Sequence, residues 1–444
     1  MQKHVKLFFM RTKTIILSVV LLTFSINIQA QQLSSLEKKV LLQIDQNNAA
    51  SIVLLEKVVN INSGSLNVKG VKKVGDIFAS EFESIGFETT WVDMPQRMGR
   101  AGHLFCELNT GTVEGKKLLL IGHLDTVFEE DSDFQEYKRE GDVVYGPGVD
   151  DMKGGNIIIY AALKALHEVG ALKNTQIIVA FTGDEEKAGN PISISRKDLI
   201  DAAKRSDIAL GFESATGLNY ATVARRSSGS WTLKTTGRRA HSSGIFSKNT
   251  GAGAIFEMSR ILTAFYKELP EKNLTFNPAT IVAGTSIHFD KKTAKGTTFG
   301  KTNIVPQSTI VQGDIRCLMN EQIEGTIKKM KSIVNNNNLP KTTATISFDL
   351  RYPPMKPTEG NYKVLKILDQ LSRDMGQGPV KAFDPAKRGA GDISFVAEYV
   401  DGLDGLGTMG KGSHSPRESM DLTTFKDLTK RAAILIYRLI HTKS

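Results

Sequence analysis

Three apolar segments that each end in acidic or histidine residues constrain this chain more than any other feature of its sequence. They are "LLLIGH" (118–123), "IIVAFT" (177–182) and "IALGF" (208–212). Segments with the composition of helices separate them. Strands that are apolar on both faces and alternate with helices are typical of an α/β sheet covered on both sides.

The polar residues that follow these strands are expected to meet. Parallel strands bring their carboxyl ends to one edge of a sheet, where open α/β folds bind ligands. His123 and Asp125 are two residues apart and project to the same side, while Glu185, Glu186 and Glu213 follow the other two strands. Acids crowded at one edge repel one another unless a cation lies among them. A metal site is therefore favoured over a set of solvated loops.

Two further segments add candidate ligands. "GPGVDDMKGG" (146–155) places Asp150 and Asp151 in a glycine-rich turn before a helix, although such a turn is also an ordinary helix cap. His414 lies in the glycine-rich "GKGSHSPRE" (410–418) and, taken alone, is equally typical of a surface histidine. Imidazoles and carboxylates from separate segments describe a site suited to one or two Zn²⁺ ions.

The pattern of the chain changes near Arg225 and predicts an inserted domain. "GSWTLKTTG" alternates apolar and polar residues, as a strand with one wet face does, and "VNNNNLP" (334–340) resembles a linker. We predict a discontinuous catalytic domain over residues 31–224 and 339–444, with a smaller α+β domain at 225–338 between its two parts.

Residues 1–30 resemble a secretory signal peptide. They carry four basic residues and no acid before an apolar stretch that ends at Ala30 and is shorter than the roughly 20 residues of a membrane-spanning helix. We expect an exported protein, periplasmic or secreted, without a stable membrane anchor after cleavage. The remaining 53 of the 57 Lys and Arg face 47 Asp and Glu, a charge of about +6. These basic residues are dispersed, which argues against nucleic-acid binding.

Together the motifs resemble a known family. "GHLDTV", "GPGVDDMKGG", "GDEEKAG", "GFES" and "GKGSHSPRE" occur in the order and at the intervals of the co-catalytic dizinc metallopeptidase and aminoacylase family, and they are most similar to its glutamate carboxypeptidase group. The resemblance implies an α/β fold with a mixed, mostly parallel sheet flanked by helices. It also implies that the inserted domain, 225–338, is a lid and dimerisation domain.

The resemblance assigns the metal ligands. It implies two Zn²⁺ ions per subunit, with Asp151 bridging them. His123 and Glu213 complete one site, and Glu186 and His414 complete the other. Asp150 stands where the family more often has alanine, so this chain carries an additional acid beside the bridging residue.

Catalytic roles follow from the same resemblance. Asp125 is expected to orient His123, and Glu185 to act as the general base. His241, in "TGRRAHSSG", matches a histidine that reaches the active site of the partner subunit and stabilises the oxyanion. This match implies a homodimer.

Substrate contacts are also implied. Asn303 in "KTNIVP" and Arg316 in "QGDIRCL" match substrate-binding residues of the family. Arg388 and Asp392 lie in "RGAGDISF", which resembles a loop near the pocket for the substrate carboxylate. An arginine suits that role because its guanidinium group binds a carboxylate through two parallel hydrogen bonds.

The expected function is that of a secreted dizinc carboxypeptidase. It would hydrolyse an amide bond and release a C-terminal amino acid, with glutamate favoured, from a small peptide or an acyl conjugate. An N-acyl-amino-acid deacylase with the same metal centre is the nearest alternative. A catalytically silent protein that binds peptides or folate-like ligands is the alternative from another class.

Overall fold

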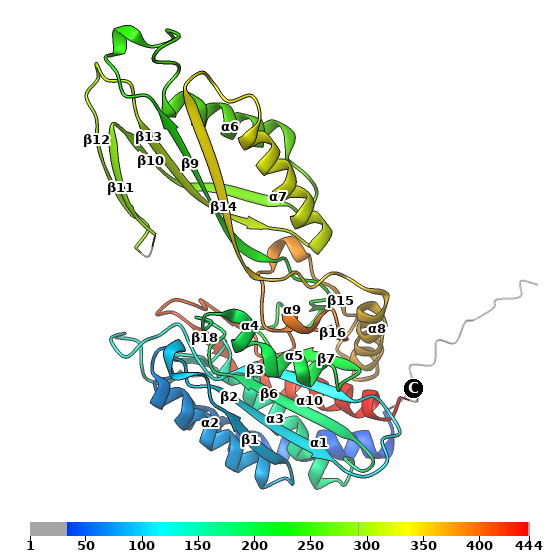
Figure 1. The fold of residues 1–444 in the computed structure, drawn as a ribbon. Helices are drawn as coiled ribbons and strands as arrows, with labels where there is room; N and C mark the ends of the chain where they lie inside the picture. The colour runs from blue at the N-terminus through cyan, green and yellow to red at the C-terminus, as the bar shows by residue number, and fades with distance from the viewer. Residues whose placement is uncertain (1–32, 292, 443–444) are drawn as a thin grey trace, which may run out of the picture.

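A six-stranded sheet, in the order β1-β2-β6-β3-β7-β16, forms the centre of the larger domain (Figure 1). The computed structural model describes residues 33–291 and 293–442, so the predicted signal segment lies outside the described residues. β3 runs parallel to β6 and β7, and β16 parallel to β7, whereas β2 is antiparallel to β1 and β6. The predicted mixed, mainly parallel sheet is confirmed. Its strands are β1 (Glu88–Val92), β2 (His103–Asn109), β3 (Leu118–His123), β6 (Gln176–Thr182), β7 (Ile208–Gly211) and β16 (Asp401–Leu403).

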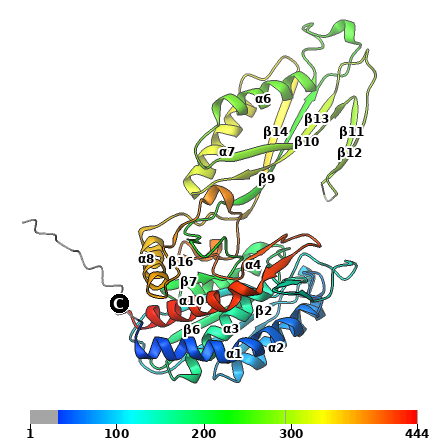
Figure 2. The ribbon, with the colours of Figure 1, turned by 180° about the vertical axis from the view of Figure 1, so that it is seen from behind.

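Helices cover both faces of this sheet. Along β3, Leu118 and Leu120 join the larger apolar core, while Leu119 and Ile121 join a second core on the opposite face. This alternation is the period of two that a strand imposes on its side chains. Helices of the larger core lie side by side along one face of the sheet (Figure 2). The helices of the larger core are α1 (Ser35–Val59), α2 (Val68–Glu83), α3 (Lys153–Glu168), α8 (Glu359–Asp374) and α10 (Leu422–Ile440). The helices of the second core are α5 (Lys197–Ala203) and α9 (Ile393–Val396), and the short helix α4 (Ile192–Ser195) precedes α5.

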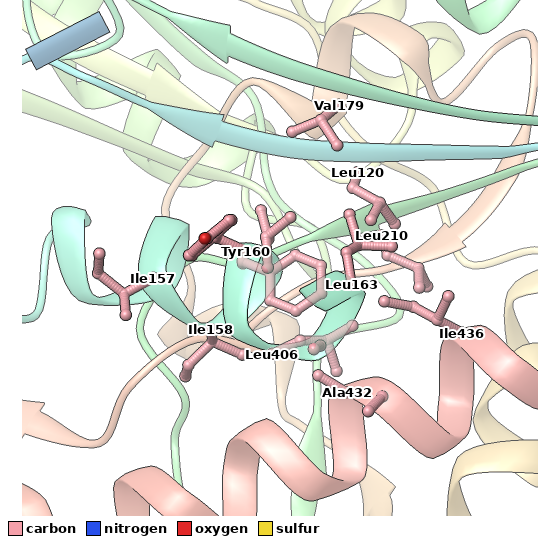
Figure 3. Packing of buried hydrophobic residues seen from close by; sticks show 14 of the residues in the cluster. Leu120, Ile157, Ile158, Tyr160, Leu163, Val179, Leu210, Leu406, Ala432 and Ile436 are labelled. Atoms are coloured by element: carbon pink, nitrogen blue, oxygen red, sulfur yellow. The ribbon is translucent and has the colours of Figure 1, made fainter. Parts of the chain in front are cut away.

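Helix α3 is enclosed between the sheet and helix α10 (Figure 3). Leu163 on α3 and Ile436 on α10 are fully buried, and α3 starts directly after the turn that holds Asp151. This packing fixes the start of α3, and with it the position of the turn, relative to the sheet edge. The first helix, α1, begins with the capping box of Ser34 and Glu37, as its sequence indicates.

The smaller domain, residues 228–352, contains a four-stranded antiparallel sheet, and we call it the lid domain. Its strand order is β10-β13-β9-β14, and two helices pack on one face of the sheet (Figure 1). Trp231 and Phe265 lie in its separate apolar core. The elements are β9 (Ser228–Gly237), α6 (Ala254–Glu268), β10 (Thr275–Gly284), β13 (Ser308–Arg316), α7 (Asn320–Asn335) and β14 (Thr342–Tyr352), with a hairpin of β11 (Ser286–Asp290) and β12 (Lys295–Phe299).

The inserted domain does not end at residue 338 as predicted, because it also contains the next strand, β14. β14 follows the asparagine-rich segment and pairs with β9 along its whole length, so it belongs to the lid sheet. The chain enters the lid domain near Arg225 and leaves it near Met355. Their backbones pair through hydrogen bonds of 2.9 and 3.0 Å, which places the two linkers side by side.

Short strands join segments near the sheet edge that are distant in sequence. A second four-stranded sheet, in the order β17-β18-β5-β4, places the His414 segment beside residues 138–145. Its strands are β4 (Lys138–Glu140), β5 (Val143–Tyr145), β17 (Gly410–Lys411) and β18 (Ser419–Asp421). The remaining elements are β8 (Tyr220–Ala221) paired with β15 (Lys381–Ala382), and the short 3-10 helices η1 (Gln96–Met98), η2 (Ser242–Gly244) and η3 (Pro385–Lys387).

Within residues 33–291 and 293–442, no helix has both the length and the hydropathy that crossing a membrane requires.

The buried side of α3 gives a stability prediction. Leu163→Ala should lower the free energy of unfolding by about 2–5 kcal/mol, because it removes buried methyl groups and leaves a cavity. Urea unfolding followed by circular dichroism measures this change. Leu42→Ala is the control, since Leu42 is 58% exposed on α1, and it should change the free energy by less than about 0.5 kcal/mol. Equal effects of the two substitutions would contradict the packing described for α3.

Candidate metal centre

The predicted ligands gather at the carboxyl edge of three adjacent strands. His123 ends β3, Glu185 and Glu186 follow β6, and Glu213 follows β7, and these strands are neighbours in the order β6-β3-β7. Asp151 lies in the turn before α3. Because the three strands are parallel, these side chains share one edge of the sheet, as predicted.

Two imidazoles approach Asp151 from opposite sides of its carboxylate. Nε2 of His123 lies 3.2 Å from Oδ1 of Asp151 and 3.8 Å from Oε1 of Glu213. Nε2 of His414 lies 3.0 Å from Oδ2 of Asp151 and 3.2 Å from Oε2 of Glu186. Each oxygen of Asp151 thus faces a different histidine, and each of these histidines lies near a different acid, which is the donor arrangement expected around a carboxylate that bridges two cations.

The donor atoms are spaced closely enough to hold metal ions. In each of two groups, His123 with Glu185 and Glu213, and His123 with Asp151 and Glu186, the donor atoms lie within 4.8 Å of one another. The buried Oε1 of Glu186 has no hydrogen-bond partner among the described residues. Mixed nitrogen and oxygen donors suit Zn²⁺. The residues therefore fit a pair of divalent cations, and Glu185 lies within reach of them.

The electrostatics of the cluster also favour cations. Burial and the nearby charge of Glu213 raise the pKa of Glu185 well above its usual value, and burial and the charge of Asp151 raise the pKa of Glu213 to about 8. Hydrogen bonds from His414 to the carboxylates of Asp151 and Glu186 raise the pKa of His414 to about 11. Without metal, the cluster retains protons that divalent cations would displace.

Asp125 connects the His123 strand to the loop that carries the acids. Its buried carboxylate accepts hydrogen bonds from the Ser65 hydroxyl at 2.6 Å and from the backbone N–H groups of Glu185 and Glu186 at 2.9 and 3.1 Å. The ring of His123 is held through Nδ1, which lies 2.9 Å from the backbone carbonyl oxygen of Asp125 and 3.4 Å from its carboxylate. The loop is therefore fixed by the carboxylate and the ring chiefly by the backbone. No motif indicated Ser65.

Glu418 and Asp150 connect the turn before α3 to the His414 segment. The buried carboxylate of Glu418 accepts hydrogen bonds from the backbone N–H groups of Asp150 and Asp151 at 2.9 and 3.0 Å. The side chain of Asp150 accepts hydrogen bonds from the hydroxyls of Ser413 and Thr408 at 3.0 and 3.1 Å. The unusual acid at position 150 is thus part of the support that holds both ligand segments.

Arg388 and Arg316 approach one loop beside the metal centre. The Nε of Arg388 is buried without a hydrogen-bond partner among the described residues. Burial and the neighbouring positive charge of Arg225 lower the pKa of Arg388. A Cβ on Gly405 would lie 3.6 Å from Nη2 of Arg388. Arg316, at the end of β13, approaches Gly389, where a Cβ would lie 3.8 Å from Nη1. The Nε of Arg316 also donates a hydrogen bond of 3.1 Å to the carboxylate of Asp314. An arginine of the lid domain therefore lies near the loop that contains Arg388.

His241 and Asn303 lie together but not at the metal centre of their own chain. The backbone N–H of Ser242 donates to the carbonyl of Asn303 at 2.9 Å, and both predicted residues are exposed. β9 leads away from the larger domain, and the segment that follows it lies at the remote end of the lid domain (Figure 1). The segment of His241 is therefore separated from the metal centre of its own chain.

Asp392 does not contact substrate space as the sequence resemblance implies. It is 3% exposed, and it accepts hydrogen bonds from the Thr182 hydroxyl at 2.5 Å and from Nε of Arg196 at 2.7 Å. Its carboxylate is therefore occupied by a buried ion pair behind the loop of Glu185. The same network contains Asp184, which also pairs with Arg196.

Proteins similar to this chain in sequence or fold include a carboxypeptidase, a desuccinylase and a dinuclear metal-binding peptidase. The chain is 28% identical over 401 residues to carboxypeptidase G2 of Pseudomonas sp. (strain RS-16), covering 88% of this chain and 89% of that protein. It is 25% identical over 366 residues to succinyl-diaminopimelate desuccinylase of Gluconobacter oxydans (strain 621H), covering 80% and 89%. The Bacillus subtilis YXEP protein, a dinuclear metal-binding peptidase of the M20 family, matches with a TM-score of 0.65 at 15% identity, covering 90% and 99%.

The chain matches a known peptidase family over a range that includes all of the candidate metal ligands. The pattern of peptidase family M20/M25/M40 matches residues 119–439. This range is well over half of the chain, and it contains all five predicted ligands. The chain therefore belongs to peptidase family M20/M25/M40.

Proposed function

We propose that the protein is an exported dizinc carboxypeptidase that hydrolyses the amide bond next to a free carboxylate and releases a C-terminal amino acid, with glutamate favoured. The position of Arg388 carries the proposal. Its Nε is buried without a hydrogen-bond partner among the described residues, and Arg316 approaches Gly389, the next residue of the same loop. The similarity to carboxypeptidase G2 supports this substrate class. Export rests on the sequence of residues 1–30.

In amide hydrolysis, the side chains of the site would bind metal, transfer a proton and bind the substrate carboxylate. Two zinc ions would be held by His123, Asp151, Glu186, Glu213 and His414, and they would supply Lewis-acid chemistry for amide hydrolysis. Glu185 accepts the proton of that water and passes it to the leaving amine. Arg388 and Arg316 bind the free carboxylate and so fix the scissile bond relative to Glu185.

A homodimer would complete this site. His241 and Asn303 are exposed and adjacent on the lid domain, and they lie away from the metal centre of their own chain. We propose that they reach the site of a second copy, where His241 stabilises the oxyanion and Asn303 binds substrate. The experiment with mixed subunits described below tests this arrangement.

Replacing the base tests the reaction. Glu185→Gln should lower kcat on a blocked dipeptide at least about 100-fold, because the amide cannot accept the proton. Elemental analysis should still find about two zinc ions per subunit. Full activity in this variant would show that Glu185 is not the base, whereas loss of metal together with activity would place it among the ligands.

Arg388 tests the proposed substrate class. Arg388→Gln should raise KM for blocked dipeptides with a free C-terminal carboxylate about 10-fold or more, and it should reduce the preference over the corresponding C-terminal amides. Arg351→Gln, at a 58% exposed arginine of β14, is the matched control and should leave both parameters unchanged. Faster hydrolysis of N-acetyl or N-succinyl amino acids than of blocked dipeptides would instead favour the deacylase function, which the similarity to the desuccinylase supports.

Mixed subunits test the homodimer. His241→Ala and Glu185→Gln proteins should each be nearly inactive, whereas dissociating and reassociating an equal mixture should restore about a quarter of wild-type activity. Half of the dimers would then be mixed, and in each of them one site would combine an intact Glu185 with the partner's His241. No recovery, despite exchange of subunits confirmed by native mass spectrometry, would exclude the role of His241 across the interface.

A further inference from the structure

A side chain of the lid domain contacts the loop that carries the proposed base. Tyr352 is the last residue of β14, which is an outer strand of the lid sheet. Its hydroxyl donates a hydrogen bond of 2.7 Å to the backbone carbonyl oxygen of Glu185. Glu185 belongs to the larger domain, so this hydrogen bond joins the two domains directly behind the candidate metal centre.

Tyr352 is held in place by a buried network. Nη2 of Arg196 donates to its hydroxyl oxygen at 3.1 Å, and the ring packs edge-on against Phe395 with centroids 4.9 Å apart. The Arg196 guanidinium group lies 5.9 Å from the centre of the Tyr352 ring and 5.5 Å from that of Phe395. Arg196 is itself anchored by Asp184 and Asp392. The phenol group of Tyr352 therefore accepts a hydrogen bond from Arg196 and donates one to Glu185, and its ring is held against Phe395.

The hydroxyl of Tyr352 remains protonated. Burial and the nearby charge of Glu185 raise the pKa of Tyr352 well above its usual value. Since Arg196 has no acceptor, the phenolic proton goes to the Glu185 carbonyl. The backbone of Glu185 is thus held on both sides of its Cα atom, because its N–H donates to Asp125 and its carbonyl accepts from Tyr352.

The position of Tyr352 also depends on the lid domain. Met355, three residues later, pairs with Arg225 of the other linker through two backbone hydrogen bonds. Tyr352 therefore lies next to the point where the two linkers pair, and its strand belongs to the lid sheet while its side chain is held by Arg196 and Phe395 of the larger domain.

We propose that Tyr352 is a positioning residue that holds Glu185 in place for proton transfer. The proposal rests on the assignment of Glu185 in the proposed function. Tyr352 acts through the peptide group of Glu185 and does not contact the reacting atoms.

The substitution Tyr352→Phe tests this proposal, because it removes only the hydroxyl oxygen that donates to Glu185. Tyr352→Phe should lower kcat about 10-fold, because a base displaced by a fraction of an ångström transfers protons poorly, while KM and zinc content stay within about twofold. Tyr399→Phe is the control, since Tyr399 is 47% exposed on the larger domain, and it should leave kcat unchanged. A wild-type kcat in Tyr352→Phe would overturn the proposal.

A second measurement needs no bound metal. In the metal-free protein, hydrogen exchange of the backbone over residues 183–189 should be faster in Tyr352→Phe than in wild type, with the lid sheet unchanged. A merely structural role would instead lower Tm and speed exchange throughout both domains, and that result would contradict the proposal.

A double substitution separates this inference from the proposed function. If Tyr352 acts through Glu185, adding Tyr352→Phe to a Glu185→Asp variant should reduce kcat by less than twofold further, because residues that act as a unit are not additive. A full additional 10-fold loss would show that Tyr352 acts elsewhere. An inactive Glu185→Gln together with a fully active Tyr352→Phe would overturn the positioning role alone, whereas an active Glu185→Gln would overturn the assigned base.

Discussion

The structure depends on burying several carboxylates at one edge of a sheet. Parallel pairing of β6, β3 and β7 forces the residues after these strands together, and like charges in a buried site are unfavourable unless cations or protons accompany them. The backbone responds to the same constraint. N–H groups of residues 185 and 186 face Asp125, and those of residues 150 and 151 face Glu418. Each supporting acid therefore fixes a loop that supplies ligands.

Both linkers to the lid domain carry side chains that reach toward this edge. Tyr352 contacts the loop of Glu185, as described above. On the other linker, Arg225 pairs with Asp404 and donates hydrogen bonds to the carbonyls of Gly389 and Ala390 at 3.0 and 2.9 Å. The loop that follows Arg388 is thus attached to Arg225, and the loop of Glu185 is attached to Tyr352 at the end of β14.

The sequence could predict those parts of the site that depend on local patterns. The strands before His123 and Glu213 were recognisable from continuous apolar residues, and the edge they share follows from parallel pairing. The capping box at Ser34 depends on four consecutive residues and was equally evident.

Contacts between distant segments could not be predicted in this way. β14 alternates exposed and half-buried residues as many strands do, so nothing in it specified pairing with β9. Asp392 follows a glycine-rich loop that resembles a substrate loop, but its partner Arg196 is 196 positions away. Tyr352 and Glu185 are 167 positions apart, and no motif links them. Side-chain partners of this kind depend on how the domains pack, which spacing along the chain does not encode.

The order of segments along the chain has a consequence for biosynthesis. A ribosome that has completed β14 has already released four of the five candidate ligands, but His414 and helix α10, which covers α3 and packs against α1, have not yet been made. Until the last segment emerges, the apolar surface beneath α10 remains exposed, and the incomplete chain can bind chaperones or aggregate. A nascent or truncated chain would therefore be inert toward amide bonds, and hydrolysis would begin only once synthesis is complete.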